Sequence, residues 1–161
     1  KKINGKINVN LKRTESFIGR IQKSNFIMLF ENGDLKIKSG SADLGKKGVF
    51  KFNISLLGTG KDQRINFFIN FLSEKGKEFL KKFYLNTENQ NISFNTSGKI
   101  TLIEKKIKFD NLTINNQKLE GKNLNLVEDS FNTHVIKDSV LGSLDFFKIK
   151  KFVREAHEIL E

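Results

Sequence analysis

Apolar and polar residues alternate along most of the chain. Ile7, Val9 and Leu11 are separated by Asn8 and Asn10. A spacing of two is typical of a strand that buries one face. The same alternation recurs around residues 26–30, 35–37, 50–56, 65–71, 92–102 and 107–114, and more weakly at 124–126. The pattern therefore predicts a mainly β fold with a sheet over about residues 3–127.

Turn-forming residues join these segments in pairs. Asn32-Gly33 lies between two alternating segments, and both residues tolerate the positive φ of a tight hairpin turn. Gly58-Thr59-Gly60 separates the next two segments in the same way. The parity of the apolar positions breaks at Asp110-Asn111, which indicates a bulge or a tight turn. We therefore expect neighbouring strands to run antiparallel.

Two segments change to a helical spacing. A period of three to four residues links Leu72, Gly76, Phe79, Leu80 and Phe83. Ser73 is a suitable N-cap, so a short inserted helix is predicted over about residues 73–84. The apolar residues between 146 and 160 repeat at the same spacing, which predicts an amphipathic C-terminal helix over about residues 144–160. Such a helix can close the end of a sheet, lie at a membrane surface or continue into further chain.

Few residues in the chain suit catalysis or metal binding. There is no Cys, which excludes disulfides, thiolate nucleophiles and cysteine-ligated metals. His134 and His157 lie far apart in the sequence, and no patterned carboxylates accompany them as ligands. Residues 58–61 (GTGK) lack the spacing of a phosphate-binding loop and join two predicted strands. We therefore expect no enzymatic activity, no catalytic residues, no metal and no cofactor.

The positive charge is confined to one half of the sequence. The formal net charge is +11, and residues 1–82 hold 18 basic and 7 acidic side chains, whereas residues 83–161 hold 11 of each. A positive region attracts nucleic acid, anionic lipid headgroups or acidic proteins. Lys46, Lys47 and Lys51 are candidates for binding headgroups or another anionic surface. Nucleic acid is the less favoured partner, because only 4 of the basic residues are Arg and most Phe residues follow the strand parity.

The apolar positions of the strands fall on one face, and two interpretations fit that face. In a closed core, such as a sandwich or a barrel, these side chains meet another layer. In a curved sheet, the apolar face stays open as a groove that takes acyl chains. For the second interpretation, the candidate lining residues are Ile7, Val9, Phe26, Met28, Phe30, Phe50, Phe52, Ile54, Ile65, Phe67, Ile69, Phe71, Phe94, Ile100, Leu102 and Phe109.

Four segments in order resemble the AsmA-like proteins, which are related to TamB-type and bridge-like lipid-transfer proteins. They are residues 3–11 (INGKINVNL), 30–37 (FENGDLKI), 79–84 (FLKKFY) and 107–114 (IKFDNLTI), and the likeness weakens after about Val127. The resemblance implies an antiparallel sheet bent into a trough or an incomplete barrel. It also implies phospholipid transport, a part in outer-membrane biogenesis, and a place in the periplasm of a Gram-negative bacterium with an inner-membrane anchor outside this chain.

No segment of the sequence matches a membrane-spanning helix. The longest apolar run covers residues 26–30, well short of the ~18–20 residues that a spanning helix needs. The first residue is not Met, so we expect residues 1–161 to be a single β-rich domain or section of a longer protein. The resulting hypothesis is a section that binds or conducts phospholipid without performing chemistry. Two alternatives stay open: a basic nucleic-acid-binding domain, and a purely structural β-domain with a closed core.

Overall fold

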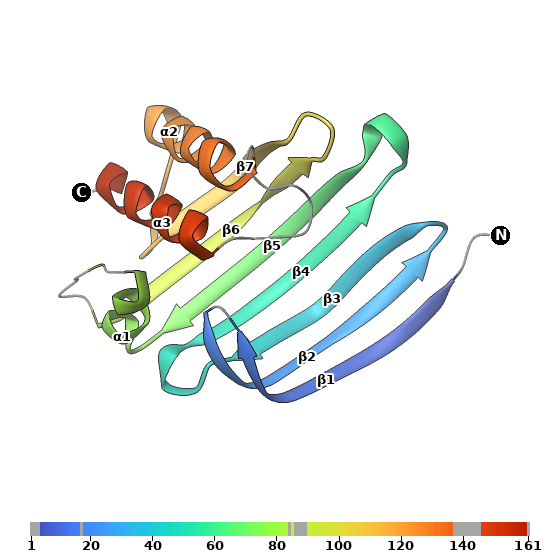
Figure 1. The fold of residues 1–161 in the computed structure, drawn as a ribbon, viewed down its shortest axis with the longest axis horizontal. Coiled ribbons are helices and arrows are strands. Elements are labelled where there is room, and N and C mark those ends of the chain that lie inside the picture. Colours follow the sequence, from blue (N-terminus) through green and yellow to red (C-terminus); the bar gives the residue numbers. More distant parts are fainter. Residues whose placement is uncertain (1–3, 17, 84, 86–89, 137–145, 161) are drawn as a thin grey trace.

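One open antiparallel sheet dominates the computed structural model, which describes residues 4–16, 18–83, 85, 90–136 and 146–160 (Figure 1). Its eight strands lie in the order in which they occur in the sequence. They are β1 (Gly5–Ser16), β2 (Gly19–Glu31), β3 (Asp34–Asp43), β4 (Val49–Leu57), β5 (Arg64–Ser73), β6 (Ile92–Thr101), β7 (Lys106–Ile114) and β8 (Gln117–Lys118). The predicted mainly β, antiparallel fold is confirmed.

The turns follow from local sequence. Asn32 and Gly33 have φ values of 56° and 95°, as a two-residue hairpin turn between β2 and β3 requires. Short 3-10 turns form the next hairpin ends, at η1 (Gly45–Lys47) and η2 (Gly60–Asp62). The predicted irregularity at residues 110–111 is a bulge, since Ser97 pairs with Asn111 while the adjacent Gly98 pairs with Phe109.

Two helices correspond to the predicted ones. The inserted helix is α1 (Gly76–Leu80), which continues as the 3-10 turn η3 (Lys81–Phe83), so it is shorter than the predicted span. Ser73 is not its N-cap: it ends β5, and its Oγ accepts a hydrogen bond from the Lys75 N–H (3.1 Å). The C-terminal helix is α3 (Phe146–Leu160), and the first two residues of its predicted span lie outside the described residues.

A third helix occupies a segment for which a strand was predicted. Helix α2 (Gly121–Phe131), followed by the π-helical turn η4 (Asn132–Ile136), replaces the weak strand at residues 124–126, so the prediction of a sheet up to residue 127 was wrong. Two apolar residues at even positions were too few to define a period. Leu126 is 42% exposed and Val127 only 1%, because Val127 shares the buried helix stripe with Leu124 and Phe131.

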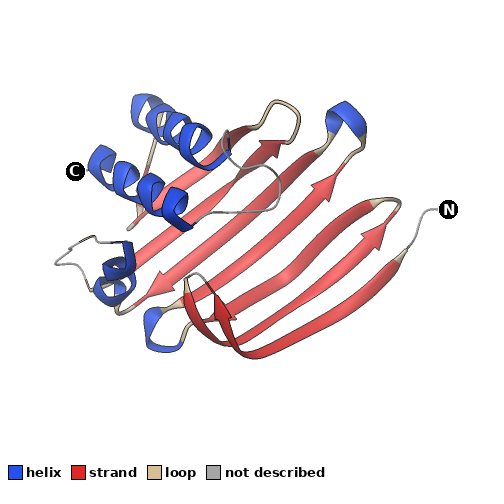
Figure 2. Ribbon diagram, viewed as in Figure 1, coloured by secondary structure: helices blue, strands red, loops and turns tan. Residues whose placement is uncertain are grey.

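All three helices cover the same face of the sheet, over its β5–β7 side (Figure 2). Buried side chains there form two clusters. The first cluster combines Ile107, Phe109 and Leu112 of β7 with Leu119 and with Val127 of α2. The second cluster combines Phe71 of β5 with Leu44 and with Phe79 and Phe83 of the inserted helical segment. Ile18 and Ile21, at the tip of the β1–β2 hairpin, also pack against the second cluster. The core therefore lies toward one side of the sheet.

Helix α2 also closes one edge of the sheet. The strand β8 is only two residues long and pairs with one end of β7. Further along β7, the Phe109 N–H donates to Glu128 Oε1 (2.7 Å) and the Ile107 N–H donates to Asn132 Oδ1 (2.7 Å). These two acceptors are four residues apart, on α2 and the turn after it. They accept the hydrogen bonds that the carbonyls of a neighbouring strand would otherwise accept. Strand β1 forms the opposite edge, with β2 as its partner strand.

Candidate functional site

One face of the sheet is apolar from β1 to β7. The register places the apolar side chains of successive strands opposite one another, so that they form continuous rows across the sheet. One such row consists of Ile7, Met28, Ile37, Ile54, Phe67, Gly98 and Phe109. A second row lies two residues further from the β4–β5 turn and includes Phe52, Ile69, Thr96 and Leu112. The strand parity predicted from the sequence therefore holds across seven strands.

The helices cover only part of this apolar face. Ten of the sixteen candidate lining residues belong to neither buried cluster, and nine of them lie on β1 to β5. These nine are Ile7, Val9, Phe26, Met28, Phe30, Phe52, Ile54, Ile65 and Ile69. Eight of them are half-buried and Ile7 is 51% exposed. We call this region, which runs from β1 to β5, the open face.

The other candidates lie elsewhere. Phe71 and Phe109 are buried in the two clusters, and Phe50, Phe67, Phe94 and Ile100 pack against them, so the helices already occupy the space above these six side chains. Leu102 follows the end of β6, where its N–H donates to the Gln63 carbonyl (3.1 Å). These seven residues are therefore not part of the open face.

The open face also includes residues outside the predicted set. Leu11, Leu35, Ile37 and Leu56 pair with residues of the apolar face and do not belong to either cluster. Leu11 is 39% exposed. Strand parity was the available signal, because Leu11 and Leu56 have the parity of an assigned residue on their own strand, and Leu35 and Ile37 alternate with Lys36 on β3.

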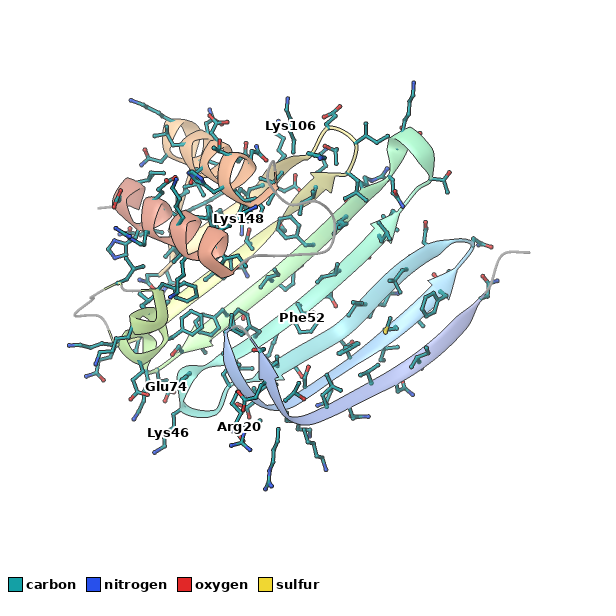
Figure 3. The ribbon with its side chains drawn as sticks, viewed as in Figure 1. Arg20, Lys46, Phe52, Glu74, Lys106 and Lys148 are labelled. Carbon is teal, nitrogen blue, oxygen red and sulfur yellow. The ribbon has the colours of Figure 1, made fainter. Side chains whose placement is uncertain are left out.

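Two phenylalanines meet across β3 in the middle of the open face. Phe26 of β2 and Phe52 of β4 have ring centroids 6.3 Å apart, at an interplanar angle of 50°. Gly40 of β3 lies opposite Phe52, and a Cβ at Gly40 would be 2.4 Å from the Phe52 ring. The missing side chain leaves the space that the ring occupies. Figure 3 shows Phe52 to the side of the region that the helices cover.

The opposite face of the sheet is mainly polar and basic, although Ile27, Leu29, Val49, Phe68 and Leu72 also lie on it. We call it the polar face. Alternate positions on the strands place nine lysines there: Lys6, Lys12, Lys23, Lys36, Lys38, Lys51, Lys99, Lys106 and Lys108. Three of these come from the second half of the sequence, which carries no net charge overall. Of the predicted headgroup residues, Lys51 lies on this polar face, whereas Lys46 and Lys47 lie in the η1 turn at one end of the sheet (Figure 3).

The pKa values of both partners are shifted in one ion pair on the polar face. The Lys36 Nζ donates to Glu31 Oε2 at 2.7 Å. This hydrogen bond and the opposite charges lower the pKa of the Glu31 carboxyl and raise the pKa of the Lys36 ammonium. Both side chains are solvent-accessible, so the pair contributes little to folding.

The histidine of the π-helical turn takes part in a contact between helices. Ser130 Oγ donates to Glu155 Oε2 (2.7 Å), and His134 Nε2 lies 2.8 Å from Glu155 Oε1. The hydrogen bond from Ser130 to the Glu155 carboxylate therefore holds α3 against α2. Among the residues that the structure describes, no three His, Asp or Glu side chains form a potential metal site. None of the described helices is long and apolar enough to cross a membrane.

Comparison of the chain with protein families, with curated proteins and with solved structures finds no match.

Proposed function

We propose that this chain is a non-enzymatic section of an AsmA-like protein that binds phospholipid acyl chains on its open face. The observation that carries this proposal is the apolar face of β1–β5, which the described helices leave uncovered. Apolar patches that stay exposed on a folded protein are typically sites of interaction. The closed-core alternative requires a second layer over these side chains, and α1, α2 and α3 provide that layer only beside them.

The chemistry of the open face suits acyl chains. Its side chains are aliphatic and aromatic, and the neighbouring strands present them in rows. Burial of each methylene contributes about 0.8 kcal/mol, so several methylenes give useful affinity without hydrogen bonds. Such a surface discriminates poorly among lipids, which suits transport of phospholipid in bulk. Phospholipid transport in outer-membrane biogenesis, in the periplasm and with an inner-membrane anchor outside this chain, follows from the AsmA-like resemblance and is part of the proposal.

The nucleic-acid alternative has less support. The nine lysines of the polar face are compatible with any anionic surface, but binding of single strands also uses aromatic side chains as stacking platforms. Phe68 is the exposed aromatic residue of the polar face, at 39% exposure. The phenylalanines of the open face lie on the other side of the sheet from the lysines.

A pair of adjacent substitutions tests the proposal. Ile54 lies on the open face and Ser55 beside it on the polar face, and both are half-buried. The protein and its Ile54→Asp and Ser55→Asp variants are purified without detergent, and phospholipid in organic extracts is quantified by mass spectrometry. We expect the parent and Ser55→Asp to carry phospholipid and a folded Ile54→Asp to lose most of it. Absence of phospholipid from the parent, combined with failure to take up a fluorescent acyl-chain probe, overturns the proposal. Full loading of folded Ile54→Asp also overturns it.

A further inference from the structure

The two edges of the sheet differ in how they are closed. Side chains of Glu128 and Asn132 accept hydrogen bonds from two N–H groups of β7, and β8 pairs with its end. Strand β1 has 12 residues, and its pairing on the described chain is with β2 on one side. Every second backbone N–H and C=O of an edge strand points away from its neighbour, so β1 presents a row of donors and acceptors.

The part of β1 that can accept a further strand is bounded. From Gly5 to Lys12 each residue pairs in regular register with β2. Arg13 departs from strand geometry, with a φ of 52°, although the same register continues at Thr14. A residue in the left-handed region does not continue the extended backbone that a further strand needs, so the usable part of β1 ends at Lys12. Within the regular part, Ile7 and Leu11 of the apolar face are 51% and 39% exposed.

We propose that two copies of this chain pair through β1, antiparallel and centred on Asn8. In this register Asn8 faces Asn8 of the second copy, Ile7 faces Val9, and Gly5 faces Leu11. Directly opposite residues in an antiparallel pair lie on the same face, so apolar residues meet apolar residues or glycine. On the polar side, Lys6 faces Asn10. The paired segment, residues 5–11, fits within the regular part of β1.

Neighbouring registers are less favourable because of charge, strand length and the backbone conformation of Arg13. A pair centred on Val9 places Lys6 opposite Lys12 twice, and like charges directly opposite each other are destabilising. A pair centred on Asn10 places Ile7 opposite Arg13, where the backbone departs from strand geometry. Shifting the centre to a point between two residues pairs polar with apolar positions, which is incompatible with one apolar face. A pair centred on Ile7 has no such conflict but limits the paired segment of β1 to residues 5–9. The sequence of β1 therefore favours the register centred on Asn8, which pairs residues 5–11.

This pairing produces a closed assembly. The two-fold axis runs perpendicular to the sheet, so both apolar faces lie on the same side and the open face continues from one copy into the other. The far edges are the two β7 edges, which α2 and β8 close in each copy. Growth therefore stops at two copies. The inference does not rest on the proposed function, although a shared open face doubles the surface available to acyl chains.

The first test measures association of lipid-free protein. Sedimentation velocity over the micromolar range should show a monomer–dimer equilibrium for the parent chain. Val9→Lys places a charge on the apolar side of the edge and should give a folded monomer, since inward-pointing charges block edge pairing. Asn123→Lys on α2 adds the same charge at an exposed position away from β1 and should dimerise like the parent. A parent that stays monomeric at the highest concentration, or a Val9→Lys variant that dimerises normally, overturns the proposal.

The second test identifies the register. The chain has no native Cys, so Asn8→Cys and Asn10→Cys each introduce a single thiol at an exposed site. With a mild oxidant, the dimer centred on Asn8 should crosslink efficiently through position 8, because a disulfide needs Cα atoms within about 7 Å. Position 10 should crosslink poorly. Asn10→Glu should tighten association by about 2- to 30-fold, since two new carboxylates face Lys6. Preferential crosslinking at position 10 contradicts this register.

The outcomes separate this inference from the proposed function. Dimerisation is measured without lipid, and phospholipid loading is measured at Ile54, which lies on β4 away from the edge. A monomer that carries phospholipid refutes only the pairing of β1, and a dimer without phospholipid refutes only the proposed function.

Discussion

The substitution Ile69→Asp distinguishes an open face from a covered one, and Leu112→Asp is its matched control. Both residues lie in one cross-strand row, on either side of Thr96. Leu112 is 3% exposed in the first cluster beneath α2, whereas Ile69 is half-buried and belongs to neither cluster. The same carboxylate is thus placed on the same face of the sheet, once under a helix and once outside it.

The expected costs differ severalfold. At Leu112 the substitution removes a buried side chain, which contributes about 1.5–3 kcal/mol, and the unpaired carboxylate loses its hydration at a further cost of several kcal/mol. Because a domain of this kind is stable by only ~5–15 kcal/mol, Leu112→Asp should be largely unfolded. At Ile69 the carboxylate keeps most of its hydration, so the loss should be about 1–2 kcal/mol, or a Tm lower by roughly 2–8 °C.

The measurement is urea unfolding followed by circular dichroism on delipidated protein. Delipidation matters because a ligand bound to the native state adds to the apparent stability. Ile69→Asn, which introduces no charge, separates lost packing from the cost of the carboxylate. If Ile69→Asp unfolds as Leu112→Asp does, while Ile69→Asn stays folded, Ile69 is covered and the closed-core interpretation is correct. If Ile69→Asp is folded and keeps its full phospholipid load, this part of the open face takes no acyl chains.

Two further substitutions test contacts that shape the sheet. Gly40→Ala should destabilise the protein by about 1–3 kcal/mol, because the new Cβ meets the Phe52 ring at 2.4 Å. The control Gly5→Ala has no atom within 4 Å of the new Cβ and should change stability by less than about 0.5 kcal/mol. Equal urea midpoints for the two variants would contradict this. Glu128→Ala should cost about 1–3 kcal/mol and accelerate amide exchange at Phe109, whose N–H loses its acceptor. Asp129→Ala, at an exposed neighbouring position, should leave that exchange rate unchanged.

The sheet was predictable because its signals are local. Alternation from Ile7 to Leu11 and the Asn32-Gly33 turn specify strands and hairpins over a few residues, and the structure confirms both. Helix α2 was missed for the same reason. Leu124 and Leu126 resemble two steps of a strand, and only the burial of Val127 and Ser130 against partners distant in sequence reveals the helical stripe.

The extent of the open face depends on tertiary packing, which alternation does not encode. Ile69 and Phe71 are two residues apart on β5 and have the same parity, yet Phe71 is 2% exposed beneath α1 and Ile69 lies outside both clusters. Nothing in the spacing of β5 indicates where a helix formed by later residues will lie. The same holds for charge: Lys99 and Lys108 belong to the neutral half of the sequence, but the register places them on the polar face beside lysines from the first half.

The amount of helix explains why part of the face stays uncovered. Seven strands about 4.8 Å apart, each nine to thirteen residues long, present a face of at least roughly 30 by 30 Å, or about 900 Å². Helices α1, α2 and α3 have 5, 11 and 15 residues. At about 1.5 Å per residue and a width of about 10 Å, their combined footprint is about 460 Å². The described helices can therefore cover at most about half of the apolar face wherever they pack. A closed core over β1–β4 would need a layer from outside these helices, and the acyl chains of the proposed function would supply a layer of that chemistry.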